Sequence, residues 1–205
     1  MKMKWVVGID EAGRGPLAGP VSVGVVLVPI DFDWNLIPGV NDSKKLSAKK
    51  RESIYERALE LAAAEKLQYS VLMPSAKAID KKGIAVVIRT AMAKGLASVC
   101  AAAQVGVLEV SVKLDGSLYA PVEYIHQETI IKGDAKEKVI GLASIMAKVT
   151  RDRYMEKIAQ KPAFKPYDFA RHKGYGTLAH RTAIAKNGLS TEHRATYCRN
   201  IRRVV

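Results

Sequence analysis

Two valine-rich segments near the N-terminus, joined by a glycine-rich loop, limit most strongly which folds are open to this chain. They are KWVVGID at residues 4–10 and PVSVGVVLVP at residues 20–29. Valine favours strands, and the Gly and Pro residues at the boundaries predict where each strand ends. A strand therefore follows the loop, whereas the glycine-rich turn of a dinucleotide-binding fold opens a helix. The spacing of Gly13, Gly15 and Gly19 also differs from GxGxxG, and the loop lacks the Gly-Lys-Ser/Thr ending of a P-loop.

Helical and strand-like segments alternate over the rest of the chain. Residues 46–66 have the period of an amphipathic helix capped by Ser47, and residues 83–103 predict a largely apolar helix. We expect further strands at 67–74, 107–115 and 122–127, and a long helical stretch from 136 to about 160. The segment from Pro162 onward is less regular, with short helices. The pattern predicts an α/β fold in which helices flank a mixed sheet, with residues 1–161 as the main domain and 162–205 as a small basic helical region packed on it.

The charge of the chain points to a polyanionic partner. The sequence has 33 Lys and Arg against 20 Asp and Glu, a net charge of +13. Residues 165–205 alone contain nine Lys or Arg and two Asp or Glu. Histidines and aromatic residues are interleaved with these charges, a mixture that suits phosphates and stacked sugars or bases. A solvated basic tail is the alternative explanation of the same charges.

The remaining composition indicates a soluble protein of the cytoplasm. Cys100 and Cys198 lie far apart, without a CxxC or Cys/His pairing, which fits a reducing compartment and argues against a disulfide framework or a zinc site. The N-terminus reaches an acidic pair before an apolar signal segment could form. We expect no run to approach the ~18 apolar residues of a membrane helix, and therefore a cytoplasmic monomer without membrane contact.

Four carboxylates fall at the ends of predicted elements: Asp10, Glu11, Asp115 and Asp134. Each has an ordinary explanation by itself, as a turn residue or a helix N-cap. Four acids brought together in a strongly basic chain would need a cation to neutralise them, and carboxylate oxygens favour Mg²⁺ or Mn²⁺. Two such ions ~4 Å apart could clamp a phosphodiester for in-line attack by water.

Six motifs occur in the order in which they occur in ribonuclease HII: GIDEAGRGPLAGPV, NDSKKLS, LDG, KGDAK, ASIMAKVTRDR and HKGYGT. The chain resembles a bacterial member of that family from about residue 8 to residue 194. The resemblance implies a ribonuclease H-like fold, with residues 1–161 as the catalytic domain and 162–205 contributing to substrate binding. It implies an endonuclease of DNA replication and repair that cuts the RNA strand of RNA–DNA hybrids and a lone ribonucleotide embedded in duplex DNA.

The resemblance also implies roles for individual residues. The metal ligands and catalytic residues would be Asp10, Glu11, Asp115 and Asp134. Gly13-Arg14-Gly15 would read the ribonucleotide, and Tyr175 would lie against the sugar at the RNA-to-DNA junction. The loop fits this role physically, because glycines let backbone groups approach a 2′-hydroxyl in a minor groove, while Arg14 anchors to phosphate or orients the loop.

Two positions depart from the family pattern. Family members often have Asn after LDG, where this chain has Ser117, and often end in a block like HRRSF, where this chain reads HRATYC from His193. No expected metal ligand is missing. The altered end leaves open what His193 and Arg194 contact.

The histidines argue against one class of ribonuclease mechanism. They lie at positions 126, 172, 180 and 193 and show no pairing signature. A ribonuclease that uses the 2′-hydroxyl as nucleophile needs a paired general acid and base. The better hypothesis is metal-activated water attacking on the 5′ side of the ribonucleotide, which leaves a 3′-hydroxyl and a 5′-phosphate. Asp10 would bridge both ions, because it ends what should be a central strand.

Weaker sequence signals indicate further substrate contacts. Asn41, Ser43, Lys44 and Lys45 precede a helix N-terminus, a place suited to phosphate, although the segment is also an ordinary helix start. Lys148, His172 and Lys173 are further candidates. Ser144 and Lys148 could share one helix face or belong to a mostly buried stretch. Asp152 is expected in an ion pair with Arg151 or Lys148, not as a fifth ligand.

Two other functions remain open at this point. A junction resolvase on the same fold would share the acids but would not need a 2′-hydroxyl reader, and a non-catalytic nucleic-acid-binding protein would not need the acids. The terminal RRVV shows no docking motif, so a sliding clamp is an open partner that the sequence does not indicate.

Overall fold

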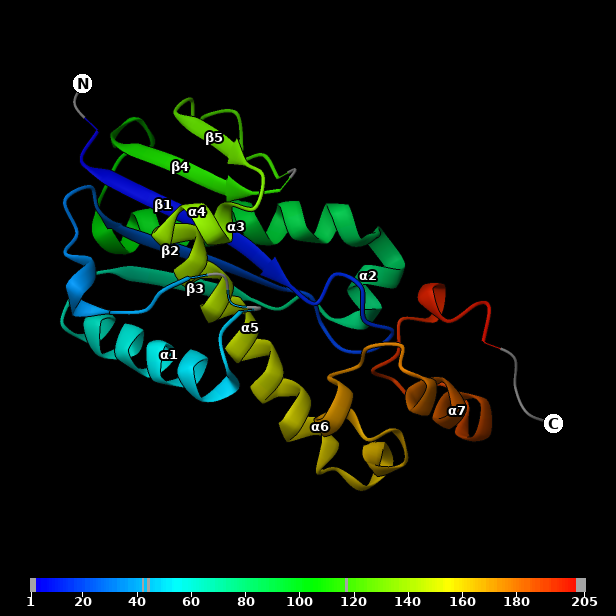
Figure 1. The fold of residues 1–205 in the computed structure, drawn as a ribbon. Helices are drawn as coiled ribbons and strands as arrows, with labels where there is room; N and C mark the ends of the chain where they lie inside the picture. The colour runs from blue at the N-terminus through cyan, green and yellow to red at the C-terminus, as the bar shows by residue number, and fades with distance from the viewer. Residues whose placement is uncertain (1–2, 42, 44, 117, 202–205) are drawn as a thin grey trace.

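A five-stranded sheet forms the centre of the computed structural model, which describes residues 3–41, 43, 45–116 and 118–201. The strand order is β3-β2-β1-β4-β5 (Figure 1). β1 pairs antiparallel with β2 and parallel with β4, so the sheet is mixed, as predicted. The strands are β1 (Trp5–Ala12), β2 (Ser22–Pro29), β3 (Gln68–Leu72), β4 (Val110–Asp115) and β5 (Gln127–Ile130).

Helices cover both faces of the sheet (Figure 1). On one face, α3 packs on valines and leucines of β1, β2 and β4, and on the other, α1 and α5 pack on β2. The α-helices are α1 (Ala48–Ala63), α2 (Ala76–Lys82), α3 (Ile84–Ala103), α4 (Gly133–Lys136), α5 (Lys138–Ala159), α6 (Phe169–His172) and α7 (Leu178–Asn187). Short 3₁₀ turns cover Trp34–Leu36, Val107–Glu109, Pro162–Tyr167 and Ala195–Tyr197.

Two strand glycines let α5 lie unusually close to the sheet. A Cβ atom added at Gly8 of β1 would overlap the carbonyl oxygen of Val139, and one added at Gly24 of β2 would overlap that of Ala143. A side chain at either position would push the helix outward. The close contact places the first turns of α5 over the end of β1, where Asp10 lies.

The expected strand at 122–127 is wrong, since β5 begins only at Gln127. Tyr124 packs in the core, but Val122 is 89% exposed and Ile125 is 63% exposed, so the apolar residues do not form one face of a strand. The Gln127 side chain instead accepts a hydrogen bond from the Ala120 amide at 2.8 Å and donates one to the Tyr124 carbonyl at 3.0 Å, which holds the segment as a loop. The pattern of apolar residues alone could not reveal this side-chain bond.

Three other features differ from the sequence prediction. The strand expected at 107–115 begins with a 3₁₀ turn and becomes β4 only at Val110. The separate helix α2 was not expected. Asp134, whose simplest explanation was an N-cap, lies inside the short helix α4, and Glu137 is the N-cap of α5.

Within the described residues, one helix meets the length and composition of a membrane span, contrary to the expectation that no segment approaches it. This helix is α3, and 44% of its most apolar window is buried within the protein. Ile88, Met92 and Leu96 of α3 belong to the main hydrophobic core together with β1 and β2. Its apolar character is therefore explained by packing against the sheet.

Residues 162–201 pack on the end of α5 through a separate hydrophobic cluster. Met155 and Ile158 of α5 belong to this cluster together with Phe164, Phe169 and Ile184. The same region approaches the loop between β1 and β2, where Ala18 and His193 form an isolated β-bridge. The division at residue 161 stays a prediction.

Candidate active site

The topology of the sheet brings the predicted acids to one edge. β1 and β4 run parallel with Ile9 opposite Leu114, so Asp10 and Asp115 follow at neighbouring strand ends. The amide of Gly133 donates a 2.6 Å hydrogen bond to Asp115 Oδ1 and thereby brings Asp134, the next residue, to this edge. The carboxyl ends of adjacent parallel strands are a common place for active sites. Asp115 and Asp134, which are far from Asp10 and Glu11 in the sequence, therefore lie beside them in the fold.

Burial and mutual repulsion make this cluster electrostatically costly. Asp10 and Asp134 are each only 5% exposed. Burial, with smaller contributions from the charges of Glu11 and Asp115, raises the pKa of Asp10 to about 8, although hydrogen bonds from Ser144 and the Glu11 amide oppose the rise. A cation beside these carboxylates would remove the repulsion.

The donor set suits a hard divalent cation. All the predicted ligands are carboxylates, the oxygen ligands that Mg²⁺ and Mn²⁺ prefer. Among the described residues, no three His, Cys, Asp or Glu side chains already stand where they could together hold one ion. The chemistry of the site thus fits the metal, and its binding requires side-chain adjustment.

Two buried serines form a hydrogen-bonded series that ends on the Asp10 side chain. Ser144 of α5 makes a side-chain hydrogen bond with Asp10, and its Oγ lies 2.8 Å from the Oγ of Ser43. Both serines are buried. Arg51 Nη1 donates to the carbonyl of Ser43 at 2.8 Å. The structure therefore gives Ser43, which the sequence placed among the phosphate contacts, an internal role beneath the acids.

The other candidates in this segment differ in their exposure. Asn41 and Lys45 are exposed, and a phosphate contact by either side chain stays a prediction. Lys44 lies outside the described residues.

The loop Gly13-Arg14-Gly15 begins two residues after Glu11 and stays beside the acids. Gly13 has φ +87°, and its carbonyl faces inward. Arg14 Nη1 forms a 3.0 Å ion pair with Glu11 Oε1, while the Arg14 side chain remains about half exposed. No atom lies within 4 Å of a Cβ built on Gly15, so Gly15 faces open space.

The loop that carries Tyr175 lies directly against this first loop. The carbonyl of Gly174, a residue with φ +83°, accepts hydrogen bonds from the amides of Leu17 at 2.9 Å and Ala18 at 3.3 Å. Tyr175 itself is 45% exposed, and its ring centroid lies 5.9 Å from Cζ of Arg151. The structure thus joins the predicted ribonucleotide reader and the predicted junction reader into one surface.

Three histidines that showed no pairing signature in the sequence meet in the interior. The ring centroids of His172 and His180 are 4.3 Å apart, and the Nε2 atoms of His180 and His193 are 3.0 Å apart. Burial lowers the pKa of both His180 and His193 to about 4. These two rings are therefore neutral at pH 7, and their place is internal.

The hydrogen bonds of these histidine rings hold the Tyr175 loop. His180 Nδ1 lies 2.9 Å from the Tyr175 carbonyl and must donate to it, so its Nε2 accepts from His193. His172 Nε2 likewise donates to the Tyr167 carbonyl at 2.6 Å, and its Nδ1 accepts from the Gly174 amide. His172, predicted as a substrate contact, uses both ring nitrogens within the protein.

The two remaining lysine candidates lie in ion pairs. Lys148 Nζ is 2.8 Å from Asp152 Oδ1, which confirms the predicted role of Asp152. Lys173 Nζ is 2.8 Å from Glu156 Oε1. Either lysine would have to exchange its carboxylate for a phosphate in order to bind substrate.

Sequence reasoning missed two arginines that are fully buried at this site, Arg151 and Arg194. Arg151 was considered only as an ion-pair partner of Asp152, and the contacts of Arg194 were left open. Their side chains donate to backbone carbonyls of the loop between β1 and β2. No sequence signal separates them from the many surface arginines of this basic chain.

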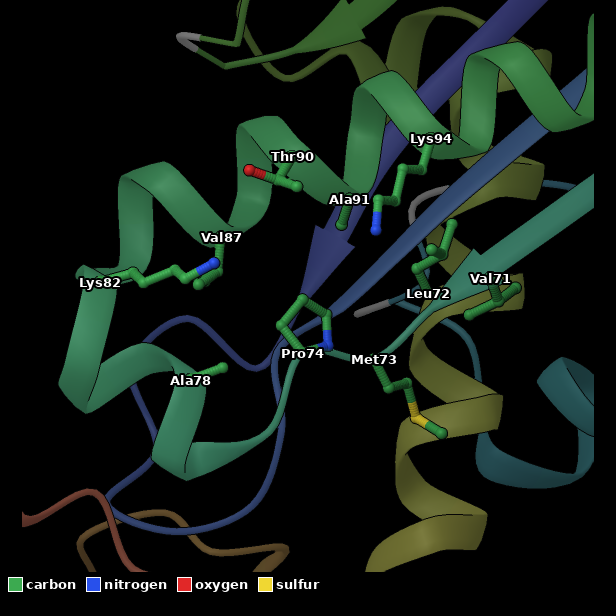
Figure 2. Close-up of a pocket in the computed structure, with 10 residues that line it drawn as sticks. All are labelled: Val71, Leu72, Met73, Pro74, Ala78, Lys82, Val87, Thr90, Ala91 and Lys94. Atoms are coloured by element: carbon green, nitrogen blue, oxygen red, sulfur yellow. The ribbon is translucent and has the colours of Figure 1, made fainter.

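A pocket open to the surface lies elsewhere in the molecule. A cavity of about 440 Å³ lies between β3, α2 and α3, with apolar walls that include Leu72 and Val87 and with Lys82 and Lys94 at its border (Figure 2). It contains none of the predicted site residues. The acids instead lie at a sheet edge beside exposed loops, an arrangement that suits a polymeric substrate.

Comparison with known proteins agrees with this geometry. The family model described as ribonuclease HII matches residues 7–200. Ribonuclease HII of Polynucleobacter asymbioticus is 42% identical over 205 residues, covering 100% of this chain and 98% of that protein. Ribonuclease HII of Aliarcobacter butzleri is 40% identical over 195 residues, covering 95% and 91%. The structure of the PCNA:RNase HII complex from Archaeoglobus fulgidus superimposes with a TM-score of 0.71 at 25% identity, covering 98% of both chains. This chain belongs to the ribonuclease HII family of metal-dependent endoribonucleases.

Proposed function

We propose that this enzyme cuts on the 5′ side of single ribonucleotides embedded in duplex DNA, in addition to the ribonuclease H activity on RNA–DNA hybrids that family membership supports. The products would carry a 3′-hydroxyl and a 5′-phosphate. One observation carries the proposal: the loop Gly13-Arg14-Gly15 follows directly on the acids at the end of β1. Recognition of the ribose and cleavage beside it would thus concern neighbouring atoms of one nucleotide.

Four residues would hold two divalent ions: Asp10, Glu11, Asp115 and Asp134. Bound Mg²⁺ or Mn²⁺ would supply a nucleophilic water and neutralise charge on the scissile phosphodiester. The burial of Asp10 and the raised pKa of its carboxyl group support this assignment, because a buried acid cluster without a cation is unfavourable.

The chain's own groups fix the acids in place. Ser144 orients Asp10, and the Gly133 amide orients Asp115 at 2.6 Å. Both groups donate hydrogen bonds to carboxylate oxygens and thus favour the ionised form that a metal requires. The buried Ser43 supports Ser144 in turn.

Recognition of the ribose would rest on the backbone of the first loop. A duplex presents the 2′-hydroxyl in its minor groove, where a side chain on the loop would keep backbone groups away. Gly15 faces open space and leaves room for this approach. Arg14 is half exposed beside Glu11, where it can reach a phosphate.

The basic region 162–205 would bind the duplex on both sides of the cut as a substrate-binding part of the enzyme. Its exposed Arg171 and Arg199 support this proposal. We further propose that Asn41, Lys45, Lys148 and Lys173 contact backbone phosphates, the last two after release from their carboxylate partners. Such contacts fix position without reading sequence.

Replacing Tyr175 by Ala should lower kcat/KM for a duplex with one ribonucleotide by the loss of a stacking contact worth ~1–3 kcal/mol. The loss should be smaller on a long hybrid, where the enzyme can use several registers. Tyr175→Phe keeps the ring and isolates the contribution of the hydroxyl group. The measurement is kcat/KM of both variants on both substrates, with thermal unfolding beside it. Equal losses on both substrates together with a much lower unfolding temperature would make Tyr175 a structural residue.

The proposed function is tested on matched DNA duplexes that contain no, one or several ribonucleotides, with and without divalent metal. Metal-dependent cleavage on the 5′ side of the single ribonucleotide, with the all-DNA duplex intact, is the expected result. Cleavage of branched all-DNA substrates would favour a junction resolvase. Binding without cleavage of any substrate would favour a non-catalytic nucleic-acid-binding protein.

A further inference from the structure

Arg194 binds three successive parts of the loop between β1 and β2. Its Nη2 donates to the Gly13 carbonyl at 2.7 Å, its Nη1 to the Arg14 carbonyl at 2.9 Å and its Nε to the Gly19 carbonyl at 3.0 Å. The side chain is fully buried. One guanidinium group thus joins both ends of the loop that carries the proposed ribonucleotide reader.

Arg151, which comes from the middle of α5, completes the support of the same loop. Its Nε donates to the Pro20 carbonyl at 2.8 Å and its Nη2 to the Ala18 carbonyl at 3.0 Å. A Cβ added at Gly13 would overlap the Nε and Cδ atoms of Arg151, so the loop lies directly on this side chain. The ring of Tyr175 lies 5.9 Å from its Cζ. Arg151 therefore contacts both the Gly13–Gly15 loop and the loop that carries Tyr175.

Two buried arginines in one place are costly. Neither forms an ion pair with a carboxylate in the part of the chain that the structure describes, and burial lowers the pKa of Arg194 to about 10, with the neighbouring charge of Arg151 acting in the same direction. Apolar residues of similar volume often stabilise a protein more than buried charges do. Apolar residues, however, could not donate to the loop carbonyls, which would then be buried without partners.

We propose that Arg151 and Arg194 are positioning residues that hold the Gly13–Gly15 loop, together with Tyr175, in the geometry needed to read the ribonucleotide. The inference rests on the proposed function of that loop. It assigns the two arginines no contact with the substrate, because both are fully buried beneath the loop. A role limited to global stability is the alternative.

The test uses Arg194→Lys and Arg151→Lys in the full-length enzyme. A lysine keeps the charge but cannot form the planar fork of donors. The matched control is Arg153→Lys, two residues from Arg151 on the same helix, where an exposed arginine pairs with Glu52 and Glu56. The measurements are amide hydrogen exchange of residues 13–20 and 172–176, kcat/KM on the single-ribonucleotide duplex, and thermal unfolding.

In both arginine variants we expect faster exchange at residues 13–20, with exchange of β1 and β4 unchanged. kcat/KM should fall roughly 10- to 100-fold, as for a catalytic geometry displaced by about 1 Å. Arg153→Lys should change neither the exchange of residues 13–20 nor kcat/KM. Arg194→Ala should regain activity in millimolar guanidinium chloride but not in the same concentration of NaCl. If the variant were only less stable, guanidinium would lower its activity further, because guanidinium is a denaturant.

Unchanged exchange of residues 13–20 in both folded lysine variants would overturn the inference, as would guanidinium failing to restore Arg194→Ala. If Arg194→Lys unfolds, Arg151→Lys gives the same measurements with only two hydrogen bonds lost. Faster loop exchange with unchanged cleavage of the single-ribonucleotide duplex would support positioning of the loop and contradict its proposed role as the reader. The positioning role of the two arginines and the reader role of the loop can therefore be disproved separately.

Discussion

Asp10→Asn and Asp134→Asn should each lower kcat on an RNA–DNA hybrid by about 10³-fold or more, equivalent to ~4 kcal/mol of transition-state stabilisation. Each change removes one carboxylate charge from the acid cluster and leaves the shape of the side chain unchanged. Binding of the hybrid should survive, because the basic surface is untouched. The measurement is single-turnover cleavage at saturating enzyme, with affinity determined separately in a buffer without divalent metal.

Asp31→Asn is the matched control, because Asp31 is an exposed acid in the turn after β2. Its activity should equal that of the unchanged enzyme. Substantial turnover by Asp10→Asn or Asp134→Asn at ordinary metal concentrations would contradict the assignment of these residues as metal ligands.

The same Asp10→Asn variant should reveal the cost of the acid cluster without any activity measurement. The pKa of Asp10 in the folded protein is about 8, against 3.8 for a free side chain, chiefly because of burial. Between these values the folded state binds more protons than the unfolded state, so stability falls as the pH rises. In chelator, Asp10→Asn should therefore raise the unfolding temperature more at pH 8 than at pH 5. An equal effect at both values would remove the electrostatic explanation.

The parts of the fold that depend on local sequence were predictable. The first two strands and α1 with its Ser47 cap have the expected bounds to within a few residues, because the Val-rich segments and the helical period are unambiguous. The mixed sheet followed from them. The start of β5 was not predictable, because the Gln127 side chain bonds backbone groups of Ala120 and Tyr124 and these bonds leave no periodic signal.

The candidate site likewise contains residues that the sequence predicts and residues that it does not. Acids at the ends of strands could be grouped from the sequence, since neighbouring parallel strands bring such ends together. The buried histidines and arginines could not be recognised, because most of their partners are backbone carbonyls. Every residue supplies such a carbonyl, so the sequence holds no complementary charge to identify the contact. In a basic chain, the two internal arginines are therefore indistinguishable from those on the surface.

Gly15→Ala should lower kcat/KM on the single-ribonucleotide duplex by roughly 10²-fold, by holding the loop backbone away from the substrate. In the free protein the change should be harmless. Nothing lies within 4 Å of the added Cβ, and Gly15 is absent from the positive-φ residues. Alanine also reduces the freedom of the unfolded chain, so stability should stay equal or rise by ~0.4–1 kcal/mol.

Two other glycines sharpen this test. Gly106→Ala is the control, because Gly106 has φ −80° and a Cβ there would meet only Glu109 Oε2 at 3.7 Å, an ordinary contact far from the acids in sequence. It should leave cleavage unchanged and, like Gly15→Ala, keep stability equal or raise it by ~0.4–1 kcal/mol. Gly13→Ala should lower stability as well as activity, because Gly13 has φ +87° and its added Cβ would overlap Arg151.

Two outcomes for Gly15→Ala would contradict the prediction. Full activity would mean that the substrate does not approach the loop backbone at this residue. A loss of activity together with an equal loss of stability would mean that the glycine is needed for folding and not for substrate approach. Only an inactive and fully stable Gly15→Ala enzyme is consistent with a glycine that serves the approach of the ribonucleotide.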